Sequence, residues 1–172
     1  MTTTRELHKA VSPQHWYNIN DPNLDRKLDA ITAGAPSHLR EHLLTRISGP
    51  NCQTIINYIL AMQTEVAPAE TYRVGTIHTL KQFAEYHKPK TFYEITRQDI
   101  VDFLDSFRKP ESVDPLHKWI GTYEFYRIIL MRFFRWLYSP DIPQRQRKRP
   151  AVMENIPKLK RREISIYRPT DL

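Results

Sequence analysis

The sequence contains one cysteine, four glycines and no long apolar run. The lone cysteine, Cys52, excludes an internal disulfide and a zinc site built from several cysteines, and it suits a reducing compartment. Four glycines are few for a β-rich protein with many tight turns. No apolar stretch approaches the roughly 18 residues that a membrane-spanning helix needs, and the first residues lack the apolar core of a signal peptide. We therefore expect a helical protein of the cytoplasm.

Positive charge is in excess, with 26 Lys and Arg against 19 Asp and Glu in 172 residues, a net charge of +7. Residues 141–172 hold nine of these cations against four carboxylates, together with four prolines, which disfavour helix. The segment therefore predicts an extended basic arm. Such an arm favours a polyanion as partner, because each neutralised phosphate releases a condensed counterion. A solvated linker is the alternative.

Helical periodicity is the main structural signal, since apolar residues recur at spacings of three and four in most of the chain. Pro36 suits a first helical turn, and Gly49-Pro50 predicts the end of that helix. Thr96 and Asp99 resemble a capping box with Asp in place of the usual Glu or Gln. The expected helices span 23–31, 36–48, 52–62, 69–87, 96–107 and 116–138. They predict an all-α bundle of four to six helices, with short N-terminal helices and the extended basic C-terminal arm.

The helix expected at 116–138 has two different apolar sides. One side predicts packing in the core and holds Trp119, Tyr123, Tyr126, Leu130, Phe133 and Leu137. The opposite side holds Lys118, Gly121, Phe125, Ile128, Arg132 and Arg135. A helix that is apolar on both sides is expected in the middle of a bundle, and its cations then extend past the packing to solvent or phosphate.

Two features indicate other chemistry. His38, Glu41 and His42 match the pattern H-x-x-E-H, which places two histidines one helical turn apart and is found in a class of zinc peptidases. A polar helix face explains these residues equally well, and no separate element supplies an obvious third ligand. Cys52 lies within an apolar helical stripe, which predicts inert packing for it and no role as a nucleophile.

Several stretches taken together resemble one family. They are the helix at 69–87, the segments TFYEITRQDI (91–100), DPLHKWIGTY (114–123) and MRFFRWLY (131–138), and the exit segment 159–172. Their order and spacing resemble the core-binding domain of tyrosine recombinases, the phage-integrase family, and in particular its archaeal integrase-like branch. The resemblance covers residues 50–172.

The resemblance implies a small SAM-like helical domain that forms one half of a clamp around double-stranded DNA. A basic linker then leads to a separate catalytic domain, and the sequence lacks that domain's His-x-x-Arg element. The expected division is an N-terminal extension at 1–49, a core-binding domain at 50–140 and a linker at 141–172. We expect a chain that binds DNA without catalysing a reaction, takes no cofactor, metal or small-molecule substrate, joins the nucleoid when bound, and is compatible with a homo-oligomer on DNA.

The resemblance places the helices at 69–87 and 116–138 on the DNA. On the first, Arg73, His78 and Lys81 are chosen because we expect them to be exposed. Thr122 is expected to reach a phosphate or a base edge, and the cations mainly phosphates. The full expected set is Arg73, His78, Lys81, Lys118, Thr122, Arg132, Arg135, Lys148, Arg149, Lys158, Lys160, Arg161 and Arg162. The rival hypothesis is a helical protein-interaction module whose basic residues serve solubility.

Overall fold

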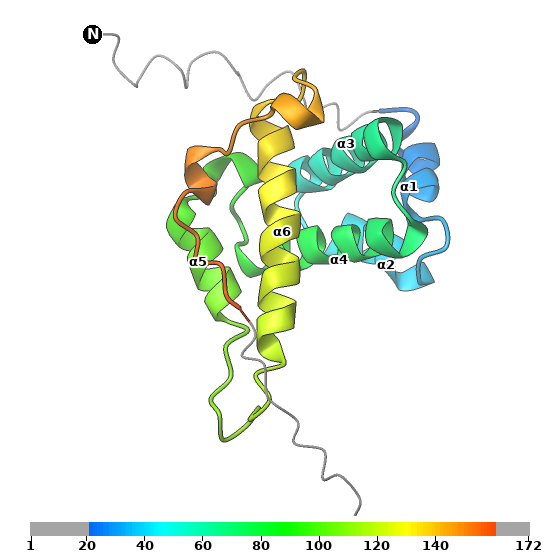
Figure 1. The fold of residues 1–172 in the computed structure, drawn as a ribbon. Helices are drawn as coiled ribbons and strands as arrows, with labels where there is room; N and C mark the ends of the chain where they lie inside the picture. Colours follow the sequence, from blue (N-terminus) through cyan, green and yellow to red (C-terminus); the bar gives the residue numbers. More distant parts are fainter. Residues whose placement is uncertain (1–20, 161–172) are drawn as a thin grey trace, which may run out of the picture. The chain divides into compact units, whose positions relative to one another are not determined.

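Residues 21–160 are the part of the chain that the computed structural model describes, and within them the protein is all helical with no strand (Figure 1). This confirms the expected all-α bundle. Among the helices of residues 21–160, none is long and apolar enough to cross a membrane. The helices are α1 (Leu24–Thr32), α2 (Ser37–Thr45), α3 (Gly49–Val66), α4 (Glu70–Tyr86), α5 (Arg97–Asp105) and α6 (Trp119–Tyr138), with short 3₁₀ turns η3 (Phe92–Glu94), η4 (Gln144–Gln146) and η5 (Ala151–Met153).

The chain divides into two compact units, one ending at Glu94 and the other starting at Ile95. This division differs from the expected boundaries at 49 and 140. Helices α1 and α2 pack against α3, so residues 24–45 belong to the first unit's fold instead of forming an extension. The N-terminal residues 1–20 lie outside the described part.

In the first unit, α3 packs against α1, α2 and α4. Its start corrects the expectation that Gly49-Pro50 ends a helix. The Ser48 hydroxyl accepts a hydrogen bond from the Asn51 backbone N–H at 3.3 Å, and Pro50 lies in the first turn, where its missing N–H costs nothing. The fully buried core of this unit contains Leu28, Ile31, Leu39, Leu43, Ile55, Ile56, Ile59, Ile77, Leu80 and Phe83.

In the second unit, α5 and α6 pack against each other and against η5. The capping box at Thr96 and Asp99 is present, as predicted. Helix α6 begins at Trp119, three residues after the expected start, because the Asp114 carboxylate accepts a hydrogen bond from the Trp119 backbone N–H at 3.0 Å. The predicted core side of α6 is confirmed at Tyr123, Leu130, Phe133 and Leu137, which are buried.

The segment after α6 returns along its own unit, so between residues 139 and 160 the expected arm is extended but anchored. Buried Arg147 donates from Nε to the Ser139 carbonyl at 3.0 Å and from Nη2 to the Pro140 carbonyl at 3.2 Å. Met153 is fully buried. The next two residues, Glu154 and Asn155, accept hydrogen bonds at their carbonyls from Arg97 of α5. The arm expected at 141–172 is therefore anchored at Arg147 and at residues 153–155, whereas Lys148 and Arg149 between these anchors are exposed.

Candidate nucleic-acid interface

Most of the excess positive charge belongs to the second unit. Residues 21–94 carry eight Lys and Arg and eight Asp and Glu, a balance of zero. Residues 95–160 carry thirteen Lys and Arg against eight Asp and Glu, a balance of +5. Attraction to a polyanion therefore acts mainly on the second unit.

One face of α6 is open to solvent. Its exposed residues are Lys118 at the N-cap, Gly121, Thr122, Phe125, Ile128 and Arg132. At 100° per residue these positions share one side of the helix. We call them the open face of α6. All of its residues are described by the structure, and none of them is acidic. Arg135, at the edge of this face, is half-buried.

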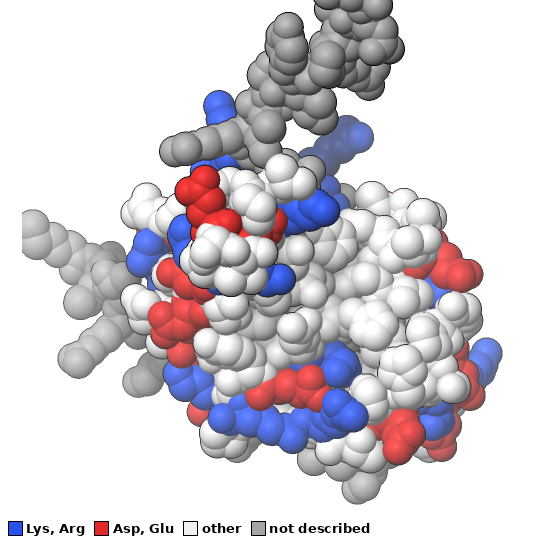
Figure 2. All heavy atoms as spheres, turned by 90° about the horizontal axis from the view of Figure 1, so that it is seen from below, with Lys and Arg blue, Asp and Glu red and all other residues white. Residues whose placement is uncertain are grey.

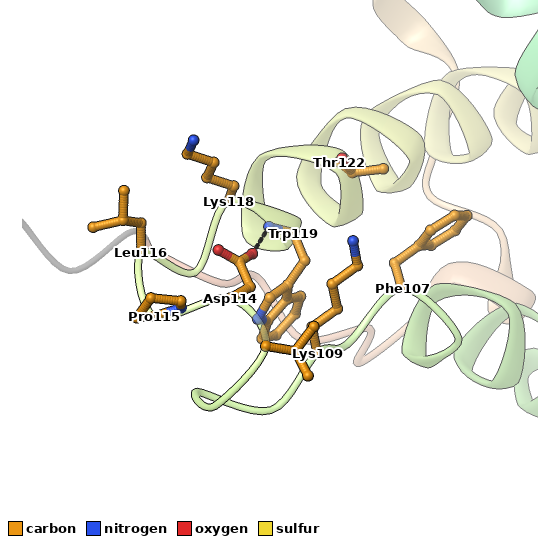
Figure 3. Close-up of a pocket in the computed structure, with 9 residues that line it drawn as sticks. Phe107, Lys109, Asp114, Pro115, Leu116, Lys118, Trp119 and Thr122 are labelled. Carbon is orange, nitrogen blue, oxygen red and sulfur yellow. Dashed lines mark hydrogen bonds between the residues drawn. The ribbon is translucent and has the colours of Figure 1, made fainter.

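A pocket of about 560 Å³ lies where the open face begins, and Figure 3 shows its lining. Lys109 from the preceding loop and Lys118 contribute ammonium groups, and Thr122 contributes a hydroxyl. Asp114 is committed to the helix start: partial desolvation opposes its charge, but backbone hydrogen bonds from Trp119 and Lys118 outweigh this and lower its pKa. The carboxylate thus caps α6, and the two lysines and the hydroxyl are placed to meet an anion.

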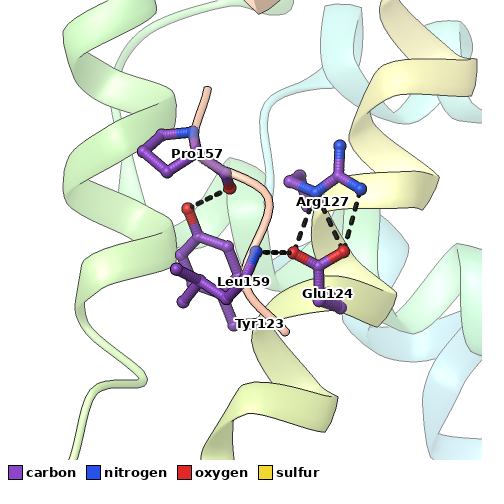
Figure 4. A network of polar contacts seen from close by, with 5 residues as sticks. All are labelled: Tyr123, Glu124, Arg127, Pro157 and Leu159. Carbon is purple, nitrogen blue, oxygen red and sulfur yellow. Dashed lines mark hydrogen bonds and ion pairs between the residues drawn. The ribbon is translucent and has the colours of Figure 1, made fainter. Parts of the chain in front are cut away.

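A polar network fixes the exit of the chain beside α6 (Figure 4). Tyr123 donates its hydroxyl to the Pro157 carbonyl at 2.9 Å, and Glu124 accepts from the Leu159 N–H at 2.7 Å. Arg127 binds the same carboxylate at 2.8 Å. Burial alone raises the pKa of Glu124, but the hydrogen bonds from Arg127 and Leu159 outweigh it and lower the pKa. The exposed residues on either side of Leu159, Lys158 and Lys160, are thereby held at the side of α6.

Two of the expected contacts on α4 are wrong in their premise, because Arg73 and Lys81 are buried, at 9% and 8% exposure. Arg73 donates to the carbonyls of Ala30 and Ala33, where α1 ends, so its guanidinium completes a helix terminus. Lys81 pairs with Glu85 one turn along the same helix, at 3.0 Å. Periodicity placed Lys81 on the outer side of α4, where α2 packs, whereas Arg73 was expected to be exposed although it lies on the same side of the helix as the buried Ile77 and Leu80.

The remaining expected residues have different positions. His78 is half-buried beside His38, with ring centroids 6.3 Å apart, and His38 lies 5.1 Å from His42. Within residues 21–160 no group of three or more His, Cys, Asp or Glu is placed to hold a metal ion. The expected cations of the returning segment, Lys148, Arg149, Lys158 and Lys160, are exposed. Arg161 and Arg162 lie outside the described residues.

Sequence reasoning missed Lys109 and the exposure of Phe125 and Ile128 at the centre of the open face. Lys109 lies in the loop after α5, just before the helix-breaking Pro110 and Pro115, so no periodic pattern assigned its side chain to a helix face. Phe125 and Ile128 were placed on the correct side of the helix, but the expectation that a second apolar side packs inside the bundle is wrong for them.

Figure 2 shows a face of the molecule on which Lys and Arg stand in separate groups with Asp and Glu among them. No continuous positive patch covers that face of the described residues, so binding of a polyanion depends on the local arrangement of cations on and beside α6. Comparisons with protein-family models, with curated proteins and with solved structures find nothing that matches this chain. The relation to tyrosine recombinases therefore stays a prediction.

Proposed function

We propose that the second unit binds double-stranded DNA with the open face of α6, as the core-binding part of a tyrosine recombinase or integrase would, and that this chain supplies no catalytic residues. The proposal depends on one observation: the open face, whose residues are all described, has no acidic residue between the cations Lys118 and Arg132. An α-helix fits the major groove of B-DNA, and phosphates line both edges of the groove.

The anchored exit segment supports the same interpretation. Glu124 and Tyr123 hold residues 157–159 against α6, so Lys158 and Lys160 stay close to the helix. A cation whose backbone is already ordered loses less conformational freedom on binding a phosphate than one on a free arm. The described exposed cations Lys118, Arg132, Lys148, Arg149, Lys158 and Lys160 supply six phosphate contacts.

Salt dependence tests the proposal. With about six phosphates neutralised, the affinity for an arbitrary duplex should fall roughly 10³-fold between 50 and 200 mM salt. The double variant Lys118→Ala/Arg132→Ala should lose about two units of the slope of log K against log salt concentration. The matched control is Arg26→Ala/Lys88→Ala, which removes two exposed cations from residues 21–94, whose charges balance. Fluorescence anisotropy on the full chain measures all three proteins.

Equal slopes for the double variant and the control contradict the proposal. The rival function, docking of another protein, is favoured by the exposure of Phe125 and Ile128. It predicts a salt-insensitive dimer or complex without DNA. Size-exclusion chromatography without DNA separates the two functions.

A further inference from the structure

Phe125 and Ile128 form an exposed apolar pair at the centre of the open face. They are 42% and 41% exposed, whereas Tyr123, Leu130 and Phe133 on the opposite side of the same helix are 1% exposed or less. Positions three apart are neighbours on a helix surface, so the two side chains make one patch. A single exposed apolar residue needs no explanation, but an adjacent pair on a face that otherwise carries polar or small residues indicates a contact.

The surroundings of the pair restrict the partner. Lys118 precedes it and Arg132 follows it, about 21 Å apart along the axis at 1.5 Å per residue. Gly121 has no side chain beyond its backbone, which leaves room for close approach one turn before Phe125. The matching surface therefore has negative charge at both ends and an apolar spot between them.

The major groove of DNA has this combination. Its edges are phosphates, and the apolar group that its floor presents is the 5-methyl group of thymine. A protein partner would need an apolar pocket flanked on both sides by acidic residues at the same spacing. This is a more specific requirement than the groove of DNA sets, and no feature of the described residues favours it. Charge complementarity at both ends of the face therefore selects DNA as the occupant.

We propose that Phe125 and Ile128 contact thymine methyl groups in the major groove while Lys118 and Arg132 contact phosphates. This inference rests on the proposed function and adds to it a source of base preference. Phosphate contacts fix position without selecting sequence, whereas an apolar contact with the thymine methyl distinguishes thymine from cytosine and from uracil.

Replacing thymine by uracil in a duplex removes the methyl groups and leaves base pairing and phosphate charge unchanged. We compare the full chain on an A·T-rich duplex of roughly 30 base pairs, about three helical turns, with the same duplex carrying uracil in place of every thymine. The wild-type chain should bind the uracil duplex about fourfold more weakly per contacted methyl, the equivalent of ~0.8 kcal/mol for each buried carbon group.

The double variant Phe125→Ala/Ile128→Ala should bind both duplexes equally and keep the wild-type salt slope, because no cation is changed. Ile142→Ala is the matched control, since Ile142 is 42% exposed in the same unit and lies outside α6. This control should retain the preference for thymine. Circular dichroism of each variant verifies that the helices are intact.

The outcomes separate the two proposals. Failure to bind either duplex contradicts the proposed function and, with it, this inference. Salt-dependent binding that is equal on the thymine and uracil duplexes leaves the proposed function in place and overturns this inference alone. A wild-type dimer without DNA that Phe125→Ala/Ile128→Ala dissolves also overturns it, because the pair then serves protein docking.

Discussion

Replacing Arg147 by methionine should destabilise the second unit by about 2 kcal/mol. The buried guanidinium donates to the carbonyls of Ser139 and Pro140, just past the end of α6. A hydrogen bond from a charged group contributes roughly 1.5–3 kcal/mol, and at least the two bonds to Ser139 and Pro140 are lost. Water that reaches the half-buried carbonyls, and the apolar volume of methionine, offset part of that loss. Arg145→Met is the control, because Arg145 is exposed two residues away and the variant has the same net charge.

Urea unfolding followed by tryptophan fluorescence measures the difference, because two of the chain's three tryptophans, Trp119 and Trp136, lie on α6. With a slope of about 2 kcal/mol per molar urea, the midpoint of Arg147→Met should fall by about 1 M. Arg145→Met should stay within about 0.5 kcal/mol of the wild-type chain, as exposed substitutions do. Equal midpoints for the two variants would refute the conclusion that Arg147 anchors the returning segment.

Three further predictions concern the first unit. Burial, followed by nearby cations, lowers the pKa of His42 and of His78, so the unfolded chain binds more protons than the folded chain in mild acid. The stability of the folded chain should therefore fall as the pH drops through about 6.5. Between about pH 7.5 and 5.5, the urea midpoint of His78→Gln should fall less than that of the wild-type chain. Gly34→Ala should cost about 1 kcal/mol or more of stability in a thermal melt, because Gly34 has φ +75° and a Cβ there meets the Glu70 carboxylate. Gly49→Ala, with open space around the added Cβ, should be neutral or stabilising. Equal effects of the two variants would contradict this prediction. Burial raises the pKa of the Cys52 thiol to about 11, so its alkylation at pH 8 should be far slower than that of a free thiol in the same assay, and equal rates would show that the site opens.

The elements that the sequence predicted well are those whose signals are local. The capping box at Thr96 and the periodic core side of α6 depend on residues within a few positions of each other, and both are present. Gly49-Pro50 was misread because the pair is compatible with the end of one helix and the start of the next. The hydroxyl of Ser48 decides between the two.

The side chains that the sequence did not predict depend on tertiary contacts. Arg73 was expected to be exposed although it shares a helix side with Ile77 and Leu80, and the partners of its guanidinium lie at the end of α1, some forty residues away in sequence. The proline-rich segment 139–160 has no periodic apolar pattern that would predict packing, yet its residues Arg147 and Met153 are buried. On α6 the pattern located Phe125 and Ile128 correctly, but the identity of what covers an apolar face is not encoded in its spacing.

Amide chemical-shift mapping of the full chain during titration with a short duplex tests the central claim most directly. The largest changes should fall at the open face of α6, from Lys118 to Arg132, and on the exit segment beside Leu159, with small changes throughout residues 21–94. Changes that concentrate on α4, or no changes at all at low salt, would contradict the assignment of DNA binding to α6.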